Sequence, residues 1–484
     1  EGIKELKIKS GRFGQNKAWR TSIRERSSNS FFKTNPITFI MLYRIFIWLF
    51  SLTIKGYFRS IYIKGMEQIP ESCPKIFVAN HNSAFMDPIV LAVHIKQQLY
   101  FLARGESFKS KIVTIIFRFL HMIPIYKPEI SPDQVHKNKM IFQKCFNHLK
   151  GGKSILIFPE GVSKTERNLR KIKTGTARIA LGAESQNNFS LNTKIVPVGI
   201  NYSNPHFFRS DVFIYFGKPI ALKNYAKEYQ LNMTETVTKV TDDIRVSLEE
   251  LVVIVKDEKL DRLIRQIEIL YRSELRVRNK HEHKAAQDFY LSQEIVKAVE
   301  YYKKIKPEKM QAFEEKINKY LKTLKQLKIR DTQIRSSKIK LKLFSKTLYF
   351  IFGFPFFLYG YLVNIIPFRA ADYLSKKITV RKDFIGSMKI AFGMFVFLIF
   401  YVLEIIVFTS FIHWYWWIVF TLSLYPLGLF TVNYIKNYYL FRGNFRYIYL
   451  FIRKSHLITE LQITRKEIIE ELEEGRQLYL NSKD

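Results

Sequence analysis

Cysteine is scarce in this chain. Its 484 residues include only two, Cys73 and Cys145. Two cysteines exclude a secreted scaffold stapled by several disulfides, and they exclude every metal site built from more than two thiolates. The cysteine content is therefore compatible with a reducing compartment.

Motifs that mark several large enzyme classes are missing as well. The sequence has no Walker A phosphate loop, no HExxH zinc motif and no G-x-S-x-G nucleophile elbow. A nucleotide-binding loop, a zinc protease and a serine hydrolase of the α/β type are thus disfavoured. We expect no metal and no other cofactor.

Acidic residues are in deficit, with 42 Asp plus Glu against 78 Lys plus Arg and a formal net charge of +36. Such an excess attracts an anionic partner, which can be nucleic acid, an acidic carrier protein or anionic lipid. The aromatic content of 15% fits a protein that meets lipid, and no zinc-finger or RNP pattern is present. We therefore expect a membrane-lipid partner and no nucleic acid.

Composition divides the chain into six segments. They are predicted to be a basic flexible extension, an interfacial or membrane helix, an α/β domain, a charged helical region, a membrane region and an amphipathic helical tail. The corresponding residues are 1–36, 37–56, 57–220, 221–342, 343–440 and 441–484.

The apolar stretches predict attachment to a membrane. Residues 38–54 contain Arg44, which favours an interfacial helix over a span. Residues 347–368 lack charge but contain Gly353, Pro355 and Gly360, which favours a re-entrant or broken helix over a span.

Residues 390–409 and 415–435 are predicted to form a spanning hairpin with aromatic residues at its turn. Lys389 precedes the hairpin and Lys436 follows it, so the positive-inside rule places both of its ends, and the α/β domain, on the cytoplasmic side.

Between residues 57 and 220, short apolar runs alternate with amphipathic segments. This alternation predicts an α/β domain with a mostly parallel sheet. The predicted strands are SIYIKG, KIFVAN, LYFLA, SILIFP, KIVPVGI and VFIYFG.

The stretch VANHNSAFMDPIV, residues 78–90, runs from a predicted strand into a predicted helix that begins at Pro88, with Asp87 as its N-cap. Asn80 and His81 follow the carboxyl end of the strand, where ligand sites form in open α/β sheets. A turn through the intervening residues can bring His81 to Asp87. Alternatively, Asp87 is only a cap and His81 only a loop residue.

Other polar residues also follow apolar runs. Glu160 and Gly161 come after SILIFP, whose Pro159 favours a turn, and Lys127 comes after HMIPIY. Arg104 follows LYFLA, and Lys173 precedes a helix, as a phosphate-binding cation would.

Pro197 lies inside an apolar run, which predicts an edge strand or a bulge near a site. Asn80, Pro159 and Pro197 are therefore expected to be structural residues next to the site.

A histidine with a carboxylate partner and no neighbouring nucleophile suits direct deprotonation of a substrate hydroxyl. In this reading His81 is the general base, and Asp87 holds its tautomer and stabilises the imidazolium.

Four ordered blocks resemble the glycerolipid acyltransferases of the glycerol-3-phosphate and lysophosphatidate type. They are Asn80-His81 through Asp87-Pro88, Ile123 to Lys127, Phe158 to Gly161 with Ser163, and Val196 to Gly199. The resemblance covers roughly residues 57–220. It implies acyl transfer from acyl-CoA or acyl carrier protein to a glycerol phosphate hydroxyl, without metal or a covalent acyl-enzyme. It also implies a place in phospholipid biosynthesis and adds Ser163 to the substrate-binding residues.

The chain differs from the family pattern at two places. Five residues separate His81 from Asp87, where four are usual; the wider spacing is similar to the branch that acylates glycerol-3-phosphate or dihydroxyacetone phosphate. Lys127 stands where the family has arginine, and His121 where it has glycine. Lysine binds phosphate as a point charge without the bidentate fork of arginine.

Two other functions are compatible with the sequence. One is a phospholipid transacylase that works without CoA. The other is a non-catalytic basic scaffold at a membrane surface, which explains the charge but not the ordered His, Asp and Glu residues.

Overall fold

The computed structural model describes residues 36–275, 283–335, 339–379, 381–411, 413 and 415–482. The chain forms two compact units, Glu1–Leu49 and Phe50–Asp484, and helix α2 (Pro36–Tyr57) runs across their boundary. The predicted extension lies outside the described residues except for its last residue. The elements below belong to the second unit.

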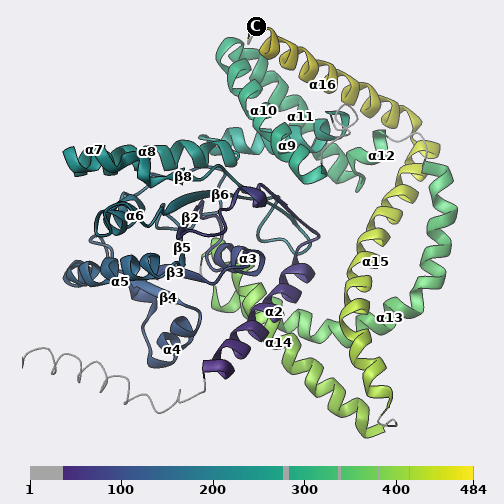
Figure 1. The fold of residues 1–484 in the computed structure, drawn as a ribbon. Helices are drawn as coiled ribbons and strands as arrows, with labels where there is room; N and C mark the ends of the chain where they lie inside the picture. Colours follow the sequence, from purple (N-terminus) through teal and green to yellow (C-terminus); the bar gives the residue numbers. More distant parts are fainter. Residues whose placement is uncertain are drawn as a thin grey trace, which may run out of the picture. The chain divides into compact units, whose positions relative to one another are not determined.

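A twisted sheet of eight strands forms the centre of the α/β domain (Figure 1). The strands are β1 Ser60–Lys64, β2 Lys75–Ala79, β3 Leu99–Arg104, β4 Met122–Ile125, β5 Ser154–Ile157, β6 Lys194–Tyr202, β7 Asp211–Phe216 and β8 Ile220–Ala221. Their order is β1-β7-β6-β2-β5-β3-β4, and β8 pairs with β6. Only the pairs of β6 with β7 and with β8 are antiparallel, which confirms the predicted, mostly parallel sheet.

Six of the eight strands are formed by the apolar runs that predicted them, whereas β4 and β8 were not predicted. β2 is buried at all five residues and is in register with both neighbours, Val78 facing Ile157 of β5 and Ala79 facing Val198 of β6. A strand covered on both faces reads as a continuous apolar run. Because β2 to β6 run in the same direction, their carboxyl ends meet at one edge, which we call the catalytic edge.

Helices cover the sheet and supply its core. They are α3 Met86–His94, α4 Lys111–Phe119, α5 Asn138–Lys150, α6 Gly175–Ser185, α7 Ala226–Leu231 and α8 Met233–Leu251. Apolar residues of α5, α6 and α8, including Leu149, Leu181 and Ile244, are buried with Ile76 and Ile155 of the sheet. Helix α8 therefore packs with the α/β core, although it lies beyond the predicted boundary at residue 220.

Pro197 does not mark an edge strand, because β6 lies inside the sheet. Pro197 faces Val78 of β2. On the other side of β6, pairing with β8 ends at Ile195 and pairing with β7 begins at Val198. Proline has no N–H to donate and is tolerated here because the neighbouring strand changes at this point.

The charged region forms a helix bundle with its own apolar core. Its helices are α9 Glu258–Leu275, α10 Lys284–Ile305, α11 Pro307–Gln326, α12 Asp331–Arg335 and α16 Ser455–Asn481. Side chains such as Ile264, Ile317 and Ile458 are fully buried between them. Phe289 of α10 packs against Phe213 of β7, with ring centroids 5.1 Å apart, so the bundle rests on one end of the sheet.

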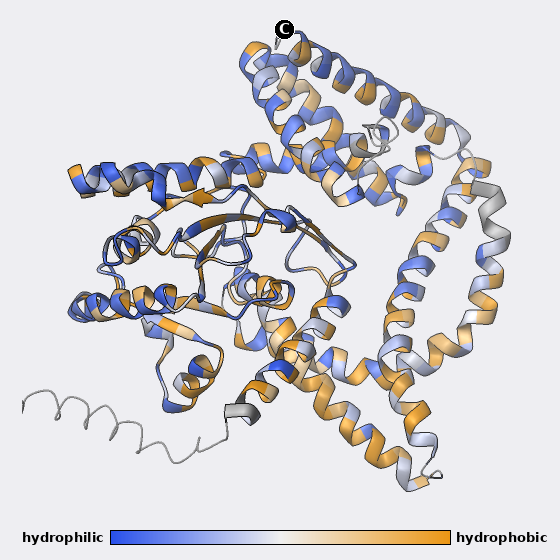
Figure 2. Ribbon diagram, viewed as in Figure 1, coloured by the Kyte–Doolittle hydropathy of each residue, from blue (hydrophilic) through white to orange (hydrophobic). Residues whose placement is uncertain are grey.

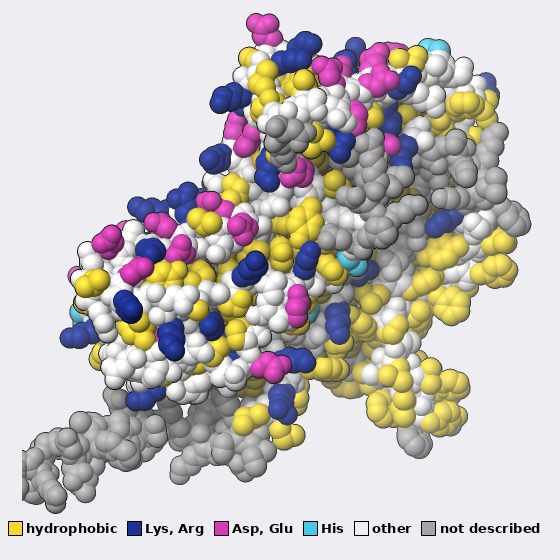
Figure 3. All heavy atoms as spheres, turned by 45° about the horizontal axis from the view of Figure 1, so that its top comes forward, with side chains coloured by type: hydrophobic (Ala, Val, Ile, Leu, Met, Phe, Trp, Pro, Cys, Tyr) yellow, Lys and Arg dark blue, Asp and Glu magenta, His cyan; other side chains and the backbone are white. Residues whose placement is uncertain are grey.

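Three long helices form the membrane region: α13 Ile339–Ile378, α14 Lys382–Phe411 and α15 Trp416–Arg453. With α2, they are the four helices among the described residues that are long and apolar enough to cross a membrane. Figure 2 shows apolar residues concentrated along α14 and the adjoining half of α15, and Figure 3 shows them gathered on a protruding lobe.

The structure corrects two predictions in this region. Helix α13 is continuous and contains both Pro355 and Pro367, so residues 347–368 do not form a broken helix. Proline inside such a helix is tolerated where neighbouring helices pack against it, and α13 packs along α14 and α15. The predicted tail begins too early, because α15 continues to Arg453.

Candidate active site

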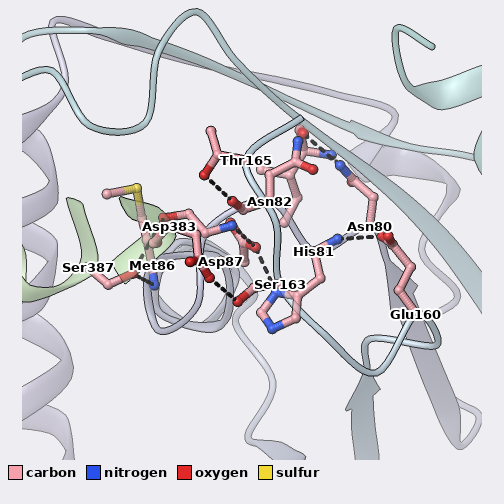
Figure 4. A network of polar contacts seen from close by, with 12 residues as sticks. Asn80, His81, Asn82, Met86, Asp87, Glu160, Ser163, Thr165, Asp383 and Ser387 are labelled. Atoms are coloured by element: carbon pink, nitrogen blue, oxygen red, sulfur yellow. Dashed lines mark hydrogen bonds and ion pairs between the residues drawn. The ribbon is translucent and has the colours of Figure 1, made fainter. Parts of the chain in front are cut away.

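The loop after β2 brings His81 to Asp87. Asn80 fixes the start of this loop, since its side chain accepts a hydrogen bond from Ile200 N at 2.7 Å and donates one to Ile200 O at 3.0 Å. The chain then turns, and His81 Nδ1 lies 2.8 Å from Asp87 Oδ2 (Figure 4). The two predicted residues are thus in direct contact.

Asp87 is fully buried and has three partners. Besides His81, the Ser83 N–H donates to Oδ2 and the Tyr202 hydroxyl donates to Oδ1, each at 2.8 Å. Burial, and next the charge of Asp87, raises the pKa of Tyr202 well above its usual range, so the phenol keeps its proton. An acceptor held in this way favours the tautomer with the proton on Nδ1 and leaves Nε2 free to accept one.

Asp87 is not the N-cap of α3. The cap position is Phe85, and Asp87 lies in the first turn with its carboxylate directed at the His81 loop. Tyr202 was not predicted, although it follows the apolar run of β6 just as His81 follows that of β2. The ring of Phe158 stacks on the His81 imidazole, with centroids 4.2 Å apart.

Glu160 holds the backbone next to the histidine. Its side chain is buried, and its two oxygens accept hydrogen bonds from His81 N at 2.8 Å and Arg170 N at 3.2 Å. Burial raises the pKa of Glu160, and the two backbone donors oppose that rise. One oxygen therefore fixes the histidine loop, and the other ties it to the backbone at Arg170.

Three predicted cations gather around the turn at Gly161. The turn has a φ of 69°, which glycine adopts without strain, and the Lys127 ammonium donates to its carbonyl oxygen. Burial lowers the pKa of Lys127, and the nearby charges of Lys173 and Arg104 lower it further. Lys173 is paired with Glu129 at 3.2 Å. This concentration of positive charge beside the histidine suits a phosphate group.

Residues after Gly161 tie the site to a distant helix. Lys164 N donates to His81 O at 3.1 Å, so this segment also contacts the histidine loop. Ser163, predicted to bind substrate, donates to Asp383 Oδ2 of α14 at 2.8 Å (Figure 4). Pro159, predicted to be structural, accepts a hydrogen bond from Lys173 N at 3.0 Å.

A cavity of about 270 Å³ adjoins the histidine loop, and its lining includes Asn80, Asn82, Asn201 and Tyr202. No group of three or more His, Cys, Asp or Glu side chains suited to a metal ion occurs within the described part of the chain.

Residues 60–201 match the model of the acyltransferase family. Glycerol-3-phosphate O-acyltransferase 1 of Saccharomyces cerevisiae is 24% identical over 48% of this chain and 42% of its own length. The 1-acyl-sn-glycerol-3-phosphate acyltransferase of Borreliella burgdorferi is 26% identical over 37% of this chain and 64% of its own length. This chain spans less than half the length of the yeast relative.

Among solved structures, the 1-acyl-sn-glycerophosphate acyltransferase PlsC from Thermotoga maritima aligns with a TM-score of 0.31 at 18% identity, covering 47% of this chain and 89% of that chain. The family match and the curated relatives confirm the resemblance drawn from the four sequence blocks.

Proposed function

We propose that this chain, whose residues 60–201 form an acyltransferase domain, transfers a fatty acyl group from a thioester to a hydroxyl of glycerol-3-phosphate or lysophosphatidate. The observation that carries the proposal is the contact of His81 Nδ1 with the buried Asp87 carboxylate at 2.8 Å. It leaves Nε2 as a base beside a cluster of cations.

In the proposed reaction, His81 Nε2 removes the proton of the acceptor hydroxyl as its oxygen attacks the thioester carbonyl carbon. The tetrahedral intermediate collapses with cleavage of the carbon–sulfur bond. The imidazolium returns its proton to the thiolate, so the products are an ester and a free thiol. Asp87 stabilises the imidazolium between these steps. No covalent acyl-enzyme and no cofactor enter the scheme.

Lys127, Lys173 and Arg104 are proposed to hold the acceptor phosphate. Arg104 supports this assignment because its Nε is buried without a hydrogen-bond partner among the described residues. A phosphate near the Gly161 turn could accept a hydrogen bond from the Arg104 Nε–H, which has no acceptor among the described residues. Acyl-CoA or an acidic acyl carrier protein is the proposed donor, and its own negative charge suits a chain of net charge +36.

The proposed location is a membrane, with the catalytic domain on the cytoplasmic side. The apolar helices α13 to α15 support it, together with the basic residues that flank them.

The test is thiol release from palmitoyl-CoA by membranes that contain the protein. Glycerol-3-phosphate, dihydroxyacetone phosphate and lysophosphatidate are supplied in turn, with the His81→Ala variant beside each. We expect release that requires one acceptor and His81. If acyl groups move between phospholipids without any thioester, the transacylase function is correct instead; equal release by His81→Ala would contradict the proposal.

A further inference from the structure

The start of α14 contacts the loops that hold the histidine. Asp383, largely buried, accepts the Ser163 hydroxyl at 2.8 Å. Arg381 fixes this carboxylate with a two-pronged contact, Nη2 to Oδ2 at 2.7 Å and Nε to Oδ1 at 3.1 Å. Arg381 Nη2 also donates to Ser163 O at 3.0 Å. Arg381 and Asp383 therefore both bind Ser163, which belongs to the block that runs from Phe158 to Ser163.

One turn further along α14, Ser387 contacts the other loop. Its side chain is fully buried, and its Oγ accepts the N–H of Met86 at 3.0 Å. Ser83 Oγ lies 3.4 Å from both Ser387 Oγ and Asp383 O. Residues four apart on a helix share one face. Asp383 and Ser387 therefore contact two loops from the same face of α14: Asp383 contacts the loop of Ser163, and Ser387 contacts the loop between His81 and Asp87.

A glycine on α14 allows this close approach. A Cβ at Gly386 would lie 2.3 Å from Pro205 O and 2.8 Å from Met86 Cε. Phe384 packs edge-on against Phe85 of the histidine loop, with ring centroids 5.9 Å apart. Helix α14 is thus held against this loop by hydrogen bonds and an aromatic contact, and Gly386 leaves the space that the close approach needs.

Each of these contacts is one step from the histidine pair. Met86 directly precedes Asp87 in the chain, and the Ser83 N–H donates to the Asp87 carboxylate. Ser163 precedes Lys164, whose N–H binds His81 O. Figure 4 shows Asp383, Ser387, Ser163 and Asp87 in one network.

We infer that Arg381, Asp383 and Ser387 are positioning residues that hold the His81–Asp87 pair in its reactive geometry. The inference rests on the proposed function. It makes the first turn of a helix long enough to cross a membrane part of the active-site structure.

The first test is kinetic, in full-length protein with saturating thioester. Asp383→Ala is expected to lower kcat about 10- to 100-fold with little change in KM, because loss of alignment acts on the chemical step. Asp383→Asn keeps one acceptor oxygen and should lose less. The matched control is Asp372→Ala, a carboxylate of α13 paired with Lys376 at 2.6 Å and with Lys389 of α14 at 3.0 Å.

A double-mutant cycle then shows whether Asp383 acts through Ser163. If it does, Ser163→Ala combined with Asp383→Ala should lower kcat no further than the more damaging single change. Independent, multiplying losses would contradict the inference, and so would a rise in KM at unchanged kcat, since that assigns the residues to substrate binding.

A second readout does not depend on turnover. The His81 side chain is 17% exposed. Its carbethoxylation by diethyl pyrocarbonate, measured by mass spectrometry on its own peptide, should become about threefold faster or more in Asp383→Ala and stay unchanged in Asp372→Ala. Unchanged modification in both variants would overturn the inference. Wild-type activity in His81→Ala would overturn the proposed function instead, and the modification rates would still decide the positioning role.

Discussion

The catalytic edge and the helix bundle use the same charged residue types in different ways. In the bundle, side chains pair with side chains: Arg465 binds Asp331 at 2.8 Å and Glu274 at 2.9 Å, and Tyr320 binds Asp331 at 2.9 Å. At the catalytic edge, carboxylates also accept backbone N–H groups of the loops, as Glu160 does from His81 and Asp87 does from Ser83.

This difference separates stability from chemistry. A pair of side chains joins two helices and can be exchanged for apolar packing, whereas a carboxylate bound to a loop N–H determines where the next side chain points. Changes in the bundle should therefore alter the free energy of unfolding, and changes at the edge should alter the reaction.

The largest expected effect is at the edge. His81→Ala should lower kcat/KM for the proposed acyl transfer by roughly 10²- to 10⁴-fold, since it removes the proposed general base. The midpoint of thermal unfolding should hardly change, because the ring is held only at one edge and one face. Acyl-transfer assays and thermal unfolding in the same detergent provide both quantities. If the midpoint of thermal unfolding fell strongly along with the activity, His81 would be a structural residue. The contrast between a stabilising bundle and a reactive edge would then be wrong.

The next effect belongs to the bundle. Asp331→Ala should lower the free energy of unfolding by about 3–5 kcal/mol, because it removes a buried partner of Arg465. The rate per folded molecule should be unchanged. Chemical denaturation gives the first quantity, and turnover normalised to folded protein gives the second. Glu470→Ala, which removes an exposed partner of Lys466, is the control and should alter neither.

Lys127→Ala should raise KM for the glycerol phosphate acceptor roughly 10- to 100-fold at unchanged kcat, the effect of one charged hydrogen bond. Because burial lowers the pKa of Lys127, the wild-type ammonium loses its proton at a lower pH than an ordinary lysine. KM for the acceptor should then rise in the alkaline range, and Lys127→Arg should abolish that rise. Initial rates measured across the alkaline range test this, and a KM independent of pH would contradict it.

The smallest effect concerns a histidine away from the catalytic edge. Burial and, next, the charge of Lys153 together lower the pKa of His148 to about 4. Between the ordinary pKa of about 6.5 and this value, the unfolded chain binds a proton that the folded chain does not, so the free energy of unfolding falls as the pH falls. His148→Phe keeps the stacking on Tyr100 and should recover about 1 kcal/mol near pH 4, a value reduced for the partial exposure of His148.

The exposed His136 is the control for that experiment. His136→Phe should leave the pH dependence of unfolding as in the wild type, and urea titrations at several pH values compare the two. If both substitutions flatten the curve equally, the environment of His148 is not its cause.

The sequence predicted the strands and the residues that follow them because both depend on short-range signals. Buried strands are apolar runs, and a polar residue after such a run lies at the edge of the sheet. His81, Glu160 and Lys127 were found in this way. Helix α13 could not be predicted as continuous, since its prolines are tolerated only through packing against α14 and α15.

The contributions of Tyr202 and Asp383 depend on long-range contacts. Tyr202 lies 115 residues from Asp87, and Asp383 lies 220 residues from Ser163. The only local sign of Asp383 is an acid in front of an apolar run, which an ordinary helix start would also explain. Nothing in the sequence connects that acid with a serine so far away.

The contact between Ser163 and Asp383 also has a consequence for biosynthesis. At ribosomal rates of about 5–20 residues per second, roughly 10–45 s pass between synthesis of the serine and of its partner 220 residues later. The α/β domain can fold during that interval, but its loops lack their brace until α14 has been made. A newly synthesised chain therefore completes the contacts around His81 and Asp87 only when α14 is made, so the proposed site is finished together with the helices that are long enough to cross a membrane.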